Sequence, residues 1–115
     1  MISQVSRSSH SGSSVLIVED SEVCGFLRRT LTQGGYDVVC VGPDDARSLL
    51  SDPHRHVDLL ITNTPAAFDG FPDVPVLYLA AIPEPERMRP FHRCRALSKP
   101  FQRAQLFASI RELLP

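Results

Sequence analysis

The 115-residue sequence contains no tryptophan, only three cysteines and no long hydrophobic stretch. A membrane-spanning helix needs roughly 18 consecutive apolar residues, and no segment approaches that length. Cys24, Cys40 and Cys94 form no CxxC pair, so neither a disulfide framework nor a zinc site is indicated. We therefore expect a soluble cytoplasmic protein with free thiols and no membrane association.

The sequence also lacks blocks of charge. Its 12 basic and 13 acidic residues leave a formal net charge of −1, and no basic stripe indicates a nucleic-acid partner. Residues 1–14 contain seven serines and no apolar run, which excludes the hydrophobic region of a secretory signal. This composition predicts a disordered Ser-rich tail at 1–14, followed by one domain at 15–115.

Short apolar runs alternate with segments of helical spacing in the rest of the chain. The runs are typical of parallel strands buried on both faces. The predicted strands are residues 15–18, 38–41, 57–62, 76–80 and 95–98. Helices are predicted after Ser21, a suitable N-cap, and from Pro43 and Pro100 onward. The alternation indicates a parallel sheet with right-handed crossovers and helices on both faces.

Proline and glycine interrupt two of these crossovers. Residues 63–75 contain three prolines, so we expect the third helix to be missing or reduced to a short loop. Residues 82–94 also contain three prolines, which leaves about two helical turns around residues 84–89. Losing a covering helix would expose an apolar patch suited to an interaction, unless Phe68 and Phe71 fold over the gap. The strand residues that could face this gap are Leu59, Ile61, Leu77 and Leu79 or their neighbours.

Polar residues follow the predicted strands where each one ends. Glu19 and Asp20 follow the first strand, Asn63 follows the third, and Lys99 follows the fifth. Sites in open parallel sheets form beyond the carboxyl ends of the strands. This edge is therefore the candidate functional site.

Four strings carry a resemblance to a known family. VLIVEDS, DLLITNTPAAFDG, VPVLYLAA and ALSKPF occur in this order, each at a strand end. Over residues 15–114 the sequence resembles the receiver domains of two-component response regulators. The resemblance implies a flavodoxin-like, doubly wound, five-stranded parallel sheet of order 2-1-3-4-5. It also implies a role in phosphorelay signal transduction without enzymatic activity.

The resemblance assigns a role to each position at the sheet edge. In receivers, two acids hold Mg²⁺, an aspartate accepts phosphate from a histidine kinase, a hydroxyl residue senses the phosphate, and a lysine neutralises it. The acids match Glu19 and Asp20, and the lysine matches Lys99. The phosphoacceptor position, however, is Asn63, and the hydroxyl position is Ala80.

A further departure is Ala96, where receivers commonly have a switching aromatic residue. An amide is a much poorer nucleophile than a carboxylate, so we expect no stable aspartyl-phosphate at Asn63. Magnesium binding at Glu19 and Asp20 is expected to be weak at best, and no cofactor is expected. Without a phosphoryl group, we expect a salt bridge or hydrogen bond among Asp20, Asn63 and Lys99.

These features favour a phosphorylation-independent pseudo-receiver. It would act by binding a protein partner, either a histidine kinase or another regulator, or by forming a homodimer. One alternative is a decoy that docks weakly on a kinase. A remote alternative is a flavodoxin-like FMN carrier, which the missing Gly-rich phosphate loop and the absence of tryptophan disfavour.

Overall fold

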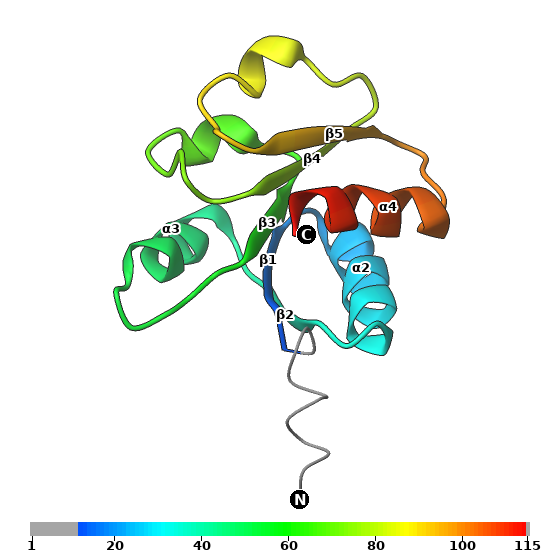
Figure 1. The fold of residues 1–115 in the computed structure, drawn as a ribbon, viewed down its shortest axis with the longest axis horizontal. Helices are drawn as coiled ribbons and strands as arrows, with labels where there is room; N and C mark the ends of the chain where they lie inside the picture. The colour runs from blue at the N-terminus through cyan, green and yellow to red at the C-terminus, as the bar shows by residue number, and fades with distance from the viewer. Residues whose placement is uncertain (1–11, 115) are drawn as a thin grey trace, which may run out of the picture.

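Five parallel strands form one sheet in the computed structural model, which describes residues 12–114 (Figure 1). In chain order they are β1 (Ser14–Val18), β2 (Asp37–Cys40), β3 (Leu59–Thr62), β4 (Val76–Ala80) and β5 (Cys94–Ser98). Across the sheet the order is β2-β1-β3-β4-β5, and every neighbouring pair is parallel. The predicted five-stranded sheet of order 2-1-3-4-5 is confirmed.

Three α-helices within residues 12–114 cover the sheet unequally. They are α2 (Ser21–Gln33), α3 (Pro43–Ser51) and α4 (Arg103–Leu113). In Figure 1, α2 and α4 lie together on one side of the sheet and α3 lies on the other. The α2 and α4 side chains pack on one core cluster, to which β1, β3 and β4 contribute alternate residues. The second cluster, beneath α3, has fewer helical members.

The two proline-rich crossovers contain only short 3₁₀ turns, at Pro65–Phe68 and Pro85–Arg87. The first turn confirms the predicted reduction of the third helix. The second is shorter than predicted, and Pro90 limits it, because a proline disfavours helical backbone at the residue before it. On this face of the sheet, α3 is therefore the only α-helix among residues 12–114.

The expected exposed apolar patch is absent from this thinly covered face. Phe68 is 0% exposed and Phe91 is 6% exposed, and both pack with Leu60 and Val76 of the sheet. The sheet residues named as candidates for the patch belong instead to the cluster beneath α2 and α4; they are Leu59, Ile61, Leu77 and Leu79. Of the two alternatives, the covered face is therefore confirmed: Phe68 fills the gap, and Phe71 packs against the same cluster.

Some element boundaries differ from the predicted ones. β3 begins at Leu59 rather than at residue 57, and α4 begins at Arg103 rather than at Pro100. Gln102 and Gln105 form a reciprocal capping box, which places the helix start after the proline. Gly35 adopts a φ of 93°, a left-handed conformation that glycine tolerates, and turns the chain from α2 into β2.

The described residues begin within the segment predicted to be a tail, and the first of them join the sheet. β1 begins at Ser14, and the backbone N–H of Gly12 donates to the Gly35 carbonyl over 2.9 Å. The Ser13 carbonyl accepts from the Asp37 N–H, also over 2.9 Å. The remainder of the predicted tail, residues 1–11, lies outside the described residues. No helix within residues 12–114 is long and apolar enough to cross a membrane.

All three cysteines are free thiols. Burial, together with the neighbouring Cys40 thiol, raises the pKa of Cys24 to about 12. Burial alone raises the pKa of Cys94 to about 11. Both side chains are therefore neutral thiols at physiological pH, and in this form they are poor nucleophiles.

We expect the Phe68→Ala variant to lose about 3–5 kcal/mol of unfolding free energy, because a fully buried ring is removed from the thinly covered face. Urea denaturation followed by circular dichroism measures this loss. Phe26→Ala is the matched control, because Phe26 is 39% exposed and its truncation should cost less than about 1 kcal/mol. Equal losses in the two variants would contradict the covering role of Phe68.

We also expect iodoacetamide at about pH 8 to modify Cys40 faster than Cys24 or Cys94. Raised pKa values keep Cys24 and Cys94 protonated, so their alkylation should accelerate only as the pH rises toward about 11–12. Peptide mapping by mass spectrometry after timed quenching gives the three rates. Rapid alkylation of Cys24 in the native protein at neutral pH would count against its burial.

Candidate functional site

The carboxyl edge of the sheet brings together the polar residues that follow the strands. Glu19 and Asp20 follow β1, Asn63 follows β3, and Lys99 follows β5. β1 and β3 are direct neighbours, although α2, β2 and α3 separate them in the sequence. The backbone N–H of Lys99 donates to the Ala80 carbonyl over 2.9 Å, which continues the β4–β5 ladder to this edge.

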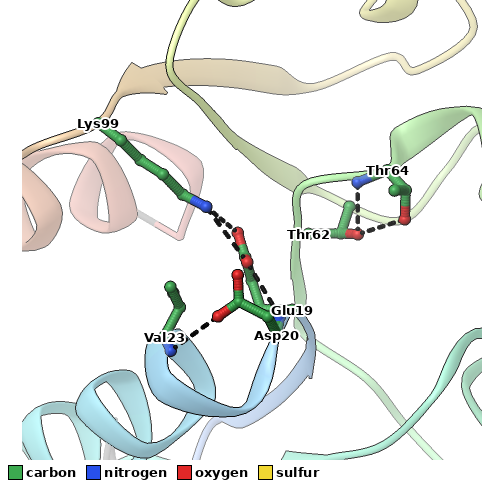
Figure 2. Close-up of polar contacts among 6 residues, drawn as sticks. All are labelled: Glu19, Asp20, Val23, Thr62, Thr64 and Lys99. Carbon is green, nitrogen blue, oxygen red and sulfur yellow. Dashed lines mark hydrogen bonds and ion pairs between the residues drawn. The ribbon is translucent and has the colours of Figure 1, made fainter.

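Glu19 and Lys99 form the central ion pair of this edge (Figure 2). Lys99 Nζ donates to Glu19 Oε1 over 3.2 Å and lies 3.0 Å from Glu19 Oε2. The Glu19 side chain is 0% exposed, whereas the Lys99 side chain is 27% exposed. Oε1 also accepts from the Asp20 N–H, but Oε2 is buried and has the cation beside it without a well-directed hydrogen bond. The carboxylate thus depends on Lys99 for its compensating charge.

Asp20 caps α2 instead of pairing with Lys99. Its carboxylate accepts from the Val23 N–H over 3.2 Å, as Figure 2 shows, and the residue is exposed. Ser21, the predicted N-cap, is instead the first residue of the helix. A carboxylate at this position satisfies a free backbone donor and interacts favourably with the helix dipole. The expected contact among Asp20, Asn63 and Lys99 is therefore replaced by a pair between Glu19 and Lys99.

Asn63 is exposed and lies between two threonines whose arrangement the sequence analysis did not identify. Thr62 is fully buried, and its hydroxyl accepts from the Thr64 N–H over 3.0 Å. The two hydroxyl oxygens are 3.3 Å apart (Figure 2). A Thr-x-Thr pattern at a strand end could have indicated this local turn. Among residues 12–114, the Asn63 side chain forms no ion pair or hydrogen bond that would draw it toward Glu19 or Lys99.

The two alanines of the site lie on neighbouring strands. Ala80 is the last residue of β4 and pairs in register with Ser98, while Ala96 is an exposed residue within β5. Neither methyl group can donate a hydrogen bond to a phosphoryl oxygen. The edge therefore contains an acid pair and a lysine but no side-chain hydroxyl at the end of β4.

An apolar groove adjoins Lys99. It has a volume of about 300 Å³ and lies between the first turns of α2 and the segment that follows β5. The rings of Phe26 and Phe101 flank it, with their centroids 6.2 Å apart and their planes inclined at 57°. Phe26 is 39% exposed, and Val39 and Ile82 are the other large hydrophobic residues exposed among those described.

Solved structures with a similar fold were found, whereas no family model and no curated protein matches the sequence. A response regulator receiver protein from Burkholderia phymatum is 21% identical, with a TM-score of 0.73 over 87% of this chain and 93% of that chain. The chemotaxis response regulator CheY4 of Vibrio cholerae is 19% identical, with a TM-score of 0.66 over 89% and 98%. The chain has the receiver fold.

A third similar structure is the signal receiver domain of an HD domain-containing protein from Pseudomonas fluorescens Pf-5. It is 20% identical, with a TM-score of 0.73 over 90% of this chain and 88% of that chain. The receiver fold thus extends over nearly all of the chain, including β3 and β4, where the crossover helices are reduced. The expected resemblance is confirmed at the level of the fold.

We expect Lys99→Met to lower the unfolding free energy by about 2–3 kcal/mol, because it leaves the buried Glu19 carboxylate without a cation. Urea denaturation measures the loss, and Glu19→Gln provides the matched background. In that background the same lysine substitution should cost much less, because the buried charge is already gone. Equal losses of unfolding free energy in both backgrounds would show that Lys99 and Glu19 have no coupling energy.

Proposed function

We propose that this receiver-fold domain is a pseudo-receiver that acts in signal transduction by binding a protein and not by accepting phosphate. The observation that carries the proposal is the ion pair between Glu19 and Lys99, in which the acid is fully buried. A receiver uses its acids and its lysine to offset the charges of magnesium and a phosphoryl group. In this chain Lys99 and Glu19 neutralise each other, which supports a site that needs neither magnesium nor a phosphoryl group.

The residues that would react with phosphate support the same proposal. Asn63 has an amide where a carboxylate nucleophile is needed, and its nitrogen is no ligand for a hard cation. Ala80 has no hydroxyl group to bind a transferred phosphoryl group. Because a nucleophile and its stabilising groups act as one unit, the loss of the nucleophile alone is enough to impair the reaction severely.

Magnesium fits the observed donors poorly. Mg²⁺ prefers a near-octahedral set of oxygen ligands and commonly binds one or two carboxylates. The Glu19 carboxylate is engaged by Lys99, and Asp20 Oδ1 accepts from the α2 backbone. No group of three or more potential metal-ligating side chains gathers anywhere in residues 12–114. We therefore propose that the domain has no resident metal ion.

The partner that we propose is another protein of a two-component or related pathway. The apolar groove beside Lys99 supports this, because Phe26 and Phe101 provide aromatic surface next to a cation. Aromatic side chains are enriched at the centres of protein interfaces, whereas lysine is depleted there, so the two rings carry this argument. A homodimer formed through β3 and β4 is not supported, because Phe68 and Phe91 cover the face that it would need.

We expect no covalent change when the protein is incubated with acetyl phosphate and Mg²⁺, because Asn63 cannot form an acyl phosphate. Intact-mass spectrometry reads the result directly. Asn63→Ala is the matched control, because it removes the amide and leaves every acidic residue in place. A persistent adduct of one phosphoryl group that disappears in this variant would refute the proposal.

We expect the Asn63→Asp variant to show no phosphorylation-driven change in association. The new carboxylate restores a nucleophile, but Ala80 and Ala96 still lack the hydroxyl and the aromatic ring that couple phosphate to the surface. Sedimentation velocity with and without acetyl phosphate measures association, and intact mass reports phosphate uptake. A change in sedimentation that requires phosphate would show that the switch is still functional.

A further inference from the structure

Cys24 and Cys40 lie against each other where α2 meets the end of β2. The Cys40 thiol donates to the Cys24 carbonyl, with 3.6 Å between sulfur and oxygen. Both side chains belong to the same region of the core, with Cys24 inside the cluster beneath α2 and α4 and Cys40 packed against it. Sixteen positions separate the two residues in the sequence, so only the fold brings them together.

A cavity of about 530 Å³ opens beside this cysteine pair. Its lining includes both cysteines, together with Arg28 and Arg29 of α2 and the Glu19 of the ion pair. Neither guanidinium pairs with a carboxylate among the described residues, whereas the single acid, Glu19, is already neutralised by Lys99. The cavity therefore combines two thiols with two unpaired positive charges, within the size range of small-molecule sites.

We propose that Cys24 and Cys40 form a reversible disulfide, and that the cavity admits an anionic low-molecular-weight disulfide of the oxidised glutathione class. Arg28 and Arg29 attract the carboxylates of such a reagent. Cys40 reacts first because it is partly exposed, whereas Cys24 is only 7% exposed and lies deeper. This inference does not rest on the proposed function.

The chemistry takes place in two thiol–disulfide exchanges. The Cys40 sulfur, as its thiolate, attacks one sulfur of the reagent; a mixed disulfide forms and one glutathione leaves as a thiolate. The Cys24 thiol gives its proton to the departing thiolate, and its sulfur attacks the Cys40 sulfur of that mixed disulfide, so that the second glutathione leaves. Cys40 no longer raises the Cys24 pKa at this stage, because its thiol has become part of the mixed disulfide. The two cysteine thiols release two protons, which the departing thiolates take up. Two electrons pass from the cysteine sulfurs to the reagent. No other oxidant is needed.

Cys94 is the internal control of this inference. It lies on β5 and packs against the cluster on the opposite face of the sheet, away from the cavity. A reagent that modified thiols without regard to the cavity would modify Cys94 as well as Cys24 and Cys40. Selective pairing of Cys24 with Cys40 is therefore the signature of the proposed site.

The experiment treats the reduced protein with oxidised glutathione, quenches with acid, alkylates the remaining thiols, and locates each modification by intact mass and peptide mapping. We expect a disulfide between Cys24 and Cys40, with Cys94 alkylated. Cys24→Ser should accumulate one glutathione on Cys40, because no second thiol is present to release it. Cys40→Ser should acquire no glutathione at Cys24, and Cys94→Ser should behave as the unmodified sequence does.

The charge of the cavity is tested separately. An Arg28→Gln/Arg29→Gln double variant should react with oxidised glutathione roughly two- to fivefold more slowly, as expected for the loss of two exposed charge interactions. Its reaction with an uncharged disulfide should be unchanged. Equal rates with oxidised glutathione in the two proteins would overturn the role of the arginines. A disulfide that involves Cys94, or a Cys40 adduct that persists although Cys24 is present, would overturn the proposal itself.

Discussion

Both faces of a parallel sheet have to be covered, and among the residues that the structure describes one face has a single α-helix to do so. Strands β3 and β4 are buried on both sides, so their backbones and alternate side chains would otherwise meet water on the α3 side. Phe68, from the first 3₁₀ turn, and Phe91, from the second crossover, provide the missing apolar volume. Arg47 of α3 donates to the Ala67 carbonyl over 3.3 Å and ties this layer to the helix.

The shortened crossovers also determine what the site can be. The loop after β3 folds immediately into the Pro65–Phe68 turn, whose last residue must reach the core, and this leaves Asn63 exposed at the sheet edge. On the other side of that edge, Glu19 is buried and draws Lys99 across from the end of β5. A buried carboxylate without a cation is costly, so this pairing constrains the edge in the absence of any ligand.

The ion pair between Glu19 and Lys99 also joins two segments that are far apart in the sequence. Lys99 belongs to the segment after β5 and Glu19 to the segment after β1, so the pair joins residues 80 positions apart. Arg95 of β5 and Glu112 of α4 form another such pair nearer the surface. Surface pairs contribute little to stability, whereas the buried position of Glu19 makes the first pair the more sensitive one.

Much of the architecture followed from local patterns. Short runs of four to six residues, most of them apolar, located all five strands, and prolines in the crossovers indicated that the third helix would be lost. The start of α4 was misplaced because Pro100 is as acceptable at a helix start as the observed cap, and only the Gln102 and Gln105 side chains distinguish them. The length of the helix in the second crossover was overestimated, because Pro90 disfavours helical backbone at the residue before it and limits the turn.

The sequence alone determined which chemical groups reach the carboxyl edge, because parallel strands end at the same edge and the residue after each strand is known. The resemblance to receivers then predicted that Asn63, Ala80 and Ala96 stand where a receiver has reactive or switching groups. The tertiary structure decided which of these groups meet. It paired Lys99 with Glu19 rather than Asp20, placed Cys24 beside Cys40, and turned Phe68 inward. These outcomes depend on burial and on distances between segments remote in sequence, which no local pattern encodes.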